Sequence, residues 1–410
     1  MQDNEKKPAL RFKGFTDPWE QRKLDEIANF SKGVGYSKND LCEEGTPIIL
    51  YGRLYTKYET SIFDVDTFVK EKAGSVYSKG GEVIVPASGE TAEDISIASV
   101  VVKPGILLGG DLNIVSPTTE YDSAFLALTI SSGAAHEYLS SLAQGKSVVH
   151  LHNADIQSVS AKFPTKREQE KIHLLFGKID TLITLHQRKY ERLVNIKKSM
   201  LDKMFPQNGA SVPEIRFKGF TDPWEQRKLG EIAKEVVRND PASDAPIMMI
   251  TAGNGFIEQS DRYAFNNAGE SLKKYILLEC GELAYNHGAS KLRPYGSCFA
   301  LTTVEKARIP FVYHCFSVEK SNPEFLSIEL NGANVENQLR KIVSSGARMD
   351  GLLNIAYSEY TEVTVQLPKK EEQDWIAKFF KHLDTLITLH QRKLEKLQNI
   401  KKSCLEKMFV

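Results

Sequence analysis

Residues 11–24 read RFKGFTDPWEQRKL, and the same fourteen letters recur at residues 216–229. A second block, DTLITLHQRK, occupies residues 180–189 and returns at residues 384–393. The blocks keep their order and nearly their spacing, whereas the stretches between them do not align by eye. The chain is therefore an internal duplication in which the repeated blocks are identical and the sequences between them differ. This pattern predicts two units that bind one kind of partner while reading two different things.

The composition is that of a globular protein with more than one domain. At 410 residues the chain exceeds the size at which a single core usually stops growing, and 41% of its residues are apolar. The five cysteines form no CxxC pair and have no zinc-like spacing with histidine, so we expect a reduced, cytoplasmic protein without a metal site. No leader peptide opens the chain and no apolar run is long enough to span a bilayer, so we expect neither secretion nor membrane insertion.

The formal net charge is zero, but the charge is unevenly placed. From residue 166 to 204, ten lysines and arginines stand against five acidic residues, and from 370 to 409 the ratio is nine to six. Whole-chain charge therefore argues neither for nor against nucleic-acid binding, while the basic excess falls on the two segments with the strongest helical pattern.

Those two segments carry a heptad pattern. Seam residues follow in alternating steps of four and three from Ile172 to Met204, and again from Ile376 to Met408. The pattern predicts two long helices that pack on each other as a coiled coil. A proline and acidic residues precede or open each helix, as is typical of a helix N-terminus. His186 and His390 fall in the seam, where a register-fixing pair and partial exposure at a loosened coil are both plausible.

A short linker rich in helix breakers follows the first long helix, so the second unit begins close to that helix's C-terminal end. With two-fold pseudosymmetry this arrangement makes the helices antiparallel, and a helix of 38 residues would be a spacer of roughly 57 Å. We expect an α+β fold: two strand-rich domains separated by two long antiparallel helices that form a coiled coil, with pseudo-two-fold symmetry. The expected boundaries are residues 1–165 (first domain), 166–205 (first helix), 206–215 (linker), 216–367 (second domain) and 368–410 (second helix).

Each domain also contains a Gly-Glu pair that leads into a short strand and a glycine-bearing loop, at residues 81–89 and 281–288. Together with the repeated opening, the Pro-x-x-x-Glu-Gln helix start and the DTLITLHQRK helix, this order of motifs resembles the specificity subunit of a type I restriction-modification system. The resemblance covers essentially the whole chain. It implies a subunit without catalytic activity whose two target-recognition domains each read one half of a split sequence in double-stranded DNA.

The resemblance also implies partners and cofactors. Two adenine-methylating modification subunits would bind this chain, and restriction subunits would join to cleave unmodified DNA. No cofactor is expected in this chain; S-adenosylmethionine would belong to the modification subunit, and ATP and Mg²⁺ to the restriction subunit.

Base reading requires donors and acceptors on loops that enter a groove, with phosphate contacts that fix the register. The loop positions of the resembled family favour particular residues as DNA contacts. In the first domain the candidate DNA-binding residues are Lys79, Ser88, Lys146, Ser147, His150 and His152. Those of the second domain are Tyr285, Asn286, His287, Lys291, Arg293 and Arg348. A lone surface lysine or arginine is more often a solvated charge.

The repeated opening is the candidate partner surface, because core packing can fix its tryptophans but not its polar residues. The candidate partner-binding residues are Trp19, Arg22, Lys23, Trp224, Arg227 and Lys228. A structural role for the repeat, or a recent duplication, would give the same identity. Two rival functions also remain: the DNA-reading subunit of a related bipartite nuclease-methylase, and a coiled-coil scaffold that binds proteins and no nucleic acid.

Overall fold

The computed structural model describes residues 8–145, 148–207, 209–262, 269–343 and 353–409. The chain divides into two compact units, and each long helix contributes to both. Unit 1 comprises Met1–Lys189 and His390–Val410, and unit 2 comprises Tyr190–Leu389. No helix in the described part of the chain is both long and apolar enough to cross a membrane.

Unit 1 is built on a five-stranded sheet with the order β2-β11-β7-β9-β5 and a smaller sheet with the order β10-β4-β6-β3. Two further strand pairs, β1-β13 and β8-β12, complete it. The strands are β1 (Glu20–Lys23), β2 (Ala28–Lys32), β3 (Leu41–Cys42), β4 (Thr46–Ile49), β5 (Ser61–Ile62), β6 (Phe68–Val69), β7 (Glu82–Pro86), β8 (Ser88–Gly89), β9 (Ser99–Val101), β10 (Leu107–Leu108), β11 (Leu112–Pro117), β12 (Val149–His150) and β13 (Ser160–Phe163). The helices are α1 (Leu24–Ile27), η1 (Lys38–Asp40), α2 (Arg53–Thr56), α3 (Ala92–Ile95), α4 (Ser123–Ile130), α5 (Gly133–Leu142), α6 (Asn153–Gln157) and the first part of α7 (Lys166–Lys203).

Unit 2 has a four-stranded sheet with the order β15-β22-β19-β20, and the strand pairs β14-β23, β16-β17 and β18-β21. Its strands are β14 (Glu225–Lys228), β15 (Ala233–Glu235), β16 (Met248–Thr251), β17 (Gly255–Glu258), β18 (Ile276–Glu279), β19 (Leu283–Asn286), β20 (Ser297–Ala300), β21 (Lys306–Ile309), β22 (His314–Val318) and β23 (Thr364–Leu367). Its helices are η2 (Leu229–Glu231), η3 (Gln259–Asp261), η4 (Gly269–Lys274), α8 (Pro323–Leu330), α9 (Ala333–Ile342), α10 (Tyr357–Tyr360) and the first part of α11 (Lys370–Met408). The short strand expected after each Gly-Glu pair is confirmed as β7 in unit 1 and β19 in unit 2.

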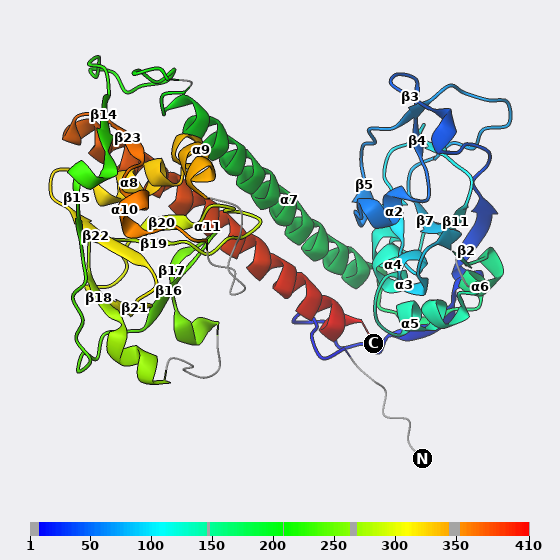
Figure 1. The fold of residues 1–410 in the computed structure, drawn as a ribbon. Helices are drawn as coiled ribbons and strands as arrows, with labels where there is room; N and C mark the ends of the chain where they lie inside the picture. Colours follow the sequence, from blue (N-terminus) through cyan, green and yellow to red (C-terminus); the bar gives the residue numbers. More distant parts are fainter. Residues whose placement is uncertain (1–7, 146–147, 208, 263–268, 344–352, 410) are drawn as a thin grey trace. The chain divides into compact units, whose positions relative to one another are not determined.

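The two units share a set of corresponding strands and helices, called the shared frame below, and differ in the strands inserted between them. The antiparallel pair β1-β13 corresponds to β14-β23, and the three strands β2-β11-β7 correspond to β15-β22-β19. In both units two successive helices and a short helix follow before the long one, as their order in Figure 1 shows. Between these shared parts, unit 1 inserts β3 to β6, whereas unit 2 inserts β16 to β18. The two copies therefore share the first and last strand pair, the central strands and the helices, and differ in the strands inserted before β7 and before β19.

Polar side chains hold the start of the helical layer identically in both units. The Asp122 carboxylate accepts from the Phe125 N–H and caps α4, and the Asn322 side chain does the same for Phe325 at the start of α8. The side-chain oxygen of Gln169 in turn accepts from the Asp122 N–H at 2.9 Å. In unit 2 the oxygen of Gln373 accepts from the Asn322 N–H at 2.8 Å. The buried glutamine of each Pro-x-x-x-Glu-Gln motif thus ties the start of the long helix to the start of α4 in unit 1 and of α8 in unit 2.

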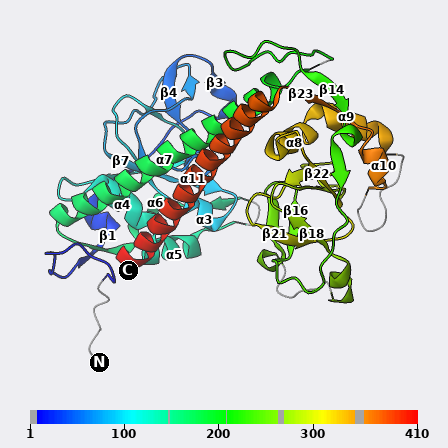
Figure 2. The same cartoon turned by 90° about the vertical axis from the view of Figure 1, so that its left-hand side faces the viewer.

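The α+β fold class and the paired long helices are confirmed. Within each unit a segment of α7 lies beside a segment of α11, as Figure 2 shows. In unit 1, the ion pair between Lys401 and Asp180 (2.6 Å) and the contact between the imidazole Nδ1 atoms of His186 and His390 (2.8 Å) set an antiparallel register. In unit 2, Lys197 pairs with Asp384 at 2.5 Å, which is the equivalent position of the repeat. The two seam histidines therefore face each other.

The end of each long helix completes an aromatic core. In unit 1, Phe409 stacks on Phe125 with ring centroids 5.5 Å apart, and Trp19 meets the same ring edge-on at 5.9 Å. In unit 2, Phe205 at the end of α7 stacks on Phe325 at 5.7 Å. The last residues of α11 thus belong to the core of unit 1, and the last residues of α7 belong to the core of unit 2.

Candidate nucleic-acid interface

In unit 1 three of the predicted DNA-binding residues come together where β7 ends. The strand continues into β8, which pairs with β12 so that Ser88 lies opposite His150. The Ser88 hydroxyl lies 3.1 Å from Nδ1 of His150, and Ser88 is buried while His150 is exposed. His152 follows two residues later and is also exposed. Ser88 therefore orients His150, and the two imidazoles are the groups that this edge presents outward.

The other unit 1 candidates are not part of this cluster. Lys79 lies before the start of β7, at the opposite end of the strand from Ser88, with its backbone N–H donating to the Glu82 carboxylate at 2.6 Å. Its side chain is exposed, so a phosphate contact there stays a prediction. Lys146 and Ser147 lie outside the described residues.

In unit 2 the corresponding strand, β19, carries Tyr285, which is only 1% exposed. Its ring stacks on Tyr360 with centroids 3.9 Å apart, and its hydroxyl donates to the Tyr295 carbonyl at 2.6 Å. Burial raises the pKa of Tyr285 well above its usual value. The side chain has a packing role in this structure, and direct contact with a base would require the core to open.

The next residues along the chain also have partners inside the protein. The Asn286 amide donates to the Ile250 carbonyl at 3.1 Å and accepts from the Gly288 N–H at 2.9 Å. Arg293 donates to the carbonyl of Asn331 at 2.6 Å, at the C-terminus of α8, and burial lowers its pKa. Arg293 thus supports the loop that carries Lys291, whose own side chain is exposed. Arg348 lies outside the described residues.

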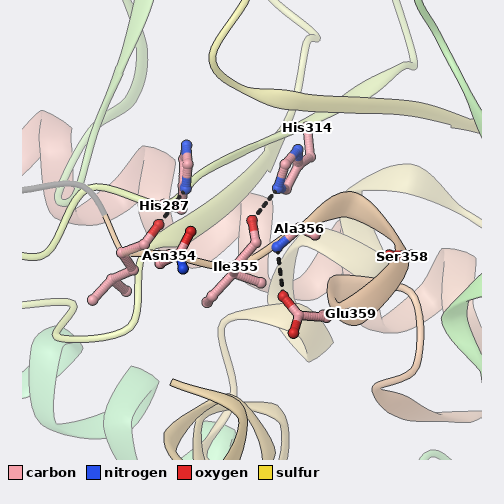
Figure 3. A pocket seen from close by; sticks show the side chains of 8 residues that line it. His287, His314, Asn354, Ile355, Ala356, Ser358 and Glu359 are labelled. Carbon is pink, nitrogen blue, oxygen red and sulfur yellow. Dashed lines mark hydrogen bonds between the residues drawn. The ribbon is translucent and has the colours of Figure 1, made fainter. Parts of the chain in front are cut away.

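A pocket of about 520 Å³ opens beside β19 and β22 in unit 2. Figure 3 shows His287 and His314 pointing toward the backbone of the segment that follows α9. The nitrogens Nδ1 of His287 and Nε2 of His314 each lie 2.8 Å from a carbonyl of that segment, those of Leu353 and Ile355. Burial and the neighbouring His287 lower the pKa of His314. The pocket is lined by His287, His314, Leu353, Asn354, Ile355, Ala356, Ser358 and Glu359.

Sequence reasoning placed only His287 of this lining in a DNA-binding role. The missed residue His314 has a counterpart in unit 1: it lies opposite Tyr285 across the strand pair, as Asn113 lies opposite Val85. The Asn113 amide donates to the Leu151 carbonyl at 2.8 Å and so holds the matching segment of unit 1. A polar residue thus positions the returning segment in both units: the buried amide of Asn113 in one and the half-buried imidazole of His314 in the other. Counting from the Gly-Glu pair gives the equivalence of Val85 and Tyr285, whereas that of Asn113 and His314 follows only from the strand pairing.

The repeated opening forms the second candidate surface. Its polar residues on β1 and on β14 are all exposed, whereas Trp19 is half-buried and Trp224 is buried in the core. Both tryptophans therefore have packing roles here, and the partner contacts predicted for this surface rest on its charged residues. These pair locally: Arg22 with Glu20, Arg227 with Glu231, and Lys228 with Glu362, while Lys23 forms no ion pair with any described residue.

Each opening is fastened to the start of the long helix by a buried ion pair. Arg11 makes a bidentate contact with Glu168 at 2.7 and 2.8 Å, and Arg216 makes the same contact with Glu372 at 2.7 Å for both bonds. The side chains of both glutamates are at most 1% exposed. The opening therefore holds one fixed position relative to the first turn of its helix.

Comparison with known proteins agrees with this geometry. The model of the type I restriction modification DNA specificity domain matches the chain twice, over residues 16–195 and 221–399. The MjaVIII specificity subunit of a type I restriction enzyme from Methanocaldococcus jannaschii is 22% identical over 367 residues, which cover 82% of this chain and 80% of that protein. The crystal structure of a type I restriction-modification S subunit from M. genitalium superimposes with a TM-score of 0.63 at 14% identity, covering 98% of this chain and 99% of that one.

A second solved structure comes from work described as the structural basis of complex assembly and conformational transition of the type I R-M system. It matches with a TM-score of 0.45 at 13% identity, covering 96% of this chain and 98% of that one. The family model alone covers most of the chain, once in each half of the duplication. The chain belongs to the family of type I restriction-modification DNA specificity proteins.

Proposed function

We propose that each unit of this non-catalytic specificity subunit reads one half of a bipartite target in double-stranded DNA. The observation that carries the proposal is the shared frame around unlike insertions, because one scaffold with two different reading surfaces fits a target with two different halves. The exposed groups at the strand ends, His150 and His152 in unit 1 and Lys291 in unit 2, are the best-placed candidates for groove or phosphate contacts. The rival scaffold function gives no reason for the two interiors to differ.

The long helices would set the distance between the two half-sites. A continuous helix of 38 residues is about 57 Å long, which suits half-sites on one face of the DNA about one helical turn apart, near 34–36 Å. The gap of unread base pairs would then be a property of α7 and α11, while the sequence read on either side would be a property of the units.

The repeated exposed side chains support docking of two copies of one partner, an adenine-methylating modification subunit at each half. The identical decapeptide of the long helices adds exposed leucines, Leu182 and Leu185 on α7 and Leu389 on α11. S-adenosylmethionine would enter the complex with the modification subunits. Restriction subunits, which use ATP and Mg²⁺, would bind this assembly to cleave unmodified DNA.

The test is an exchange of residues 25–163 for the equivalent domain of a relative, followed by mapping of methylated adenines in the genome. We expect one half of the methylated motif to change and the other half and the gap to stay the same. The joints at both ends of this segment belong to the shared frame, so the exchange preserves the ion pair between Arg11 and Glu168. A motif that changed in both halves would contradict modular reading. Failure of the assembled complex to bind DNA would favour the scaffold.

A further inference from the structure

An aromatic patch centred on one exposed tryptophan lies beside the second copy of the opening, and the described residues beside the first copy form no equivalent. Trp375, on the outer face of α11, is 59% exposed. Its ring lies 5.6 Å from that of Phe217 in the repeated opening, and Phe379 lies 6.0 Å from the same ring. Phe217, Trp375 and Phe379 thus form one continuous aromatic patch, in which Trp375 is exposed and the two phenylalanines are half-buried.

The matching position in unit 1 carries a charge. Trp375 is the third residue after Glu372, and the third residue after the equivalent Glu168 is Lys171. The Lys171 ammonium lies 4.9 Å from the centre of the Phe15 ring, over the first opening. The unit 1 surface therefore presents a cation where the unit 2 surface presents an indole ring.

The identical charged side chains of the two openings also have different neighbours. In unit 2, Lys228 pairs with Glu362 at 2.7 Å and Asp222 pairs with Lys369 at 2.6 Å. The residues at the corresponding positions of unit 1 are Ser158 and Thr165, which carry no charge. Among the described residues Lys23 and Asp17 accordingly form no ion pair. Unit 1 leaves these charges available to a partner, whereas unit 2 engages them within the chain.

These differences bear on docking because the aromatic patch is continuous with the repeated opening. Core packing does not require the exposed residues of the opening to be identical, so their repetition points to one partner species that binds twice. On the function proposed above, that partner is the modification subunit. It must then meet the same opening beside Trp375 in unit 2 and beside Lys171 in unit 1.

We propose that the two docking surfaces bind the modification subunit by different forces, so that the complex assembles stepwise with unit 2 occupied first. Aromatic burial is not screened by added salt, and tryptophan is among the residues that most often dominate binding energy. Docking on unit 1 depends on unpaired charges, which salt screens. The unit 2 site is therefore the tighter one and survives high salt, and a complex with one modification subunit is its intermediate.

The experiment is a titration of the full-length chain with the purified modification subunit of the same system, followed by native mass spectrometry at low and high salt. For the wild type we expect two steps that differ by about tenfold or more in affinity, with only the weaker step lost at high salt. Trp375→Lys should remove the tight step and make both sites salt-sensitive. The matched variant Lys171→Trp should give two tight, salt-resistant sites. Both positions are exposed, and unchanged thermal unfolding confirms that each variant is folded.

Two equal steps in the wild type, or a tight step that persists in Trp375→Lys, would overturn the proposal while leaving the proposed function intact. Loss of both steps in Trp375→Lys with the fold preserved would also overturn it, because the two surfaces would then not be independent. If no modification subunit bound the wild type under any condition, the proposed function itself would fail.

Discussion

At the scale of single residues, the buried ion pairs decide where the repeated opening sits. Glu168 is fully buried, and Arg11 is its bidentate partner. The contact with Glu168 raises the pKa of Arg11, so the guanidinium stays charged at any physiological pH. Removing one partner leaves a charge in the interior without compensation, which costs far more than an exposed pair is worth.

We therefore predict that Arg11→Ala lowers the free energy of unfolding of unit 1 by about 3–5 kcal/mol. The measurement is the shift in the midpoint of urea unfolding. Arg11→Lys should recover only part of this loss, because an ammonium cannot form the two parallel bonds that a guanidinium makes. Arg22→Ala is the control within the same opening, since Arg22 pairs with Glu20 at the surface. Equal midpoints for Arg11→Ala and Arg22→Ala would show that the buried pair does not hold the opening.

Residue identity alone could not predict which candidates face outward. Tyr285 and Arg293 have the chemistry of DNA-reading groups, but their partners Tyr360 and Asn331 come from distant parts of the chain. Burial by a distant partner leaves no local signal in the sequence. His314, which holds the segment of residues 353–355 together with His287, was missed for the same reason. The heptad seam, by contrast, is a local periodicity, and Ile172 and Phe176 are fully buried as it predicted.

At the scale of elements, a histidine pair joins α7 to α11 in unit 1. The Nδ1 atoms of His186 and His390 lie 2.8 Å apart, so one must donate and the other accept. Burial, followed by the charges of His186, Lys189 and Lys393, lowers the pKa of His390. A lowered pKa means that the unfolded chain binds more protons than the folded one over this range.

We predict that the stability contributed by this pair is present above about pH 6.5, the ordinary pKa of histidine, and is lost as the pH falls toward the lowered pKa of the folded state. The measurement is the urea midpoint as a function of pH for the wild type and for the double variant His186→Asn, His390→Asn. The wild type and the double variant must be compared because burial also raises the pKa of Glu329 to about 7. Protonation of Glu329 stabilises the folded state as the pH falls, opposite to the effect of the histidine pair. Identical pH slopes for the two proteins would exclude a role for the pair.

At the scale of the whole molecule, the proposed function gives the long helices the role of a spacer between the two half-sites. Because α7 and α11 pair through a heptad seam, an added heptad keeps the seam in register, and an addition of four residues does not. Seven residues lengthen a helix by about 10.5 Å, which corresponds to about three base pairs. The repeated heptad pattern predicts the pairing of the two helices from the sequence. The sequence motifs do not show that each helix is divided between two units, because this depends on which core each helix end enters.

We predict that inserting one heptad after Lys189 and another before His390 produces an active subunit whose target has the same two halves and a gap longer by about three base pairs. Mapping of methylated adenines measures both properties at once. The matched control inserts four residues at each place and should fail to assemble an active complex. An active heptad variant with an unchanged gap would show that the helices do not set the distance.

The closing of unit 1 by the end of α11 has a consequence for the order in which the protein forms on the ribosome. Unit 2 is one uninterrupted stretch of chain and has all its core residues once α11 has begun to emerge. Most of unit 1 is translated before unit 2, yet Met408 and Phe409 of its core come from the end of α11 and are made after unit 2. Domains generally fold as units, and incompletely buried apolar surface attracts chaperones and promotes aggregation. The half synthesised first must therefore wait with an open core until α11 is complete, and a truncation within the last two turns of α11 damages unit 1 while leaving unit 2 whole.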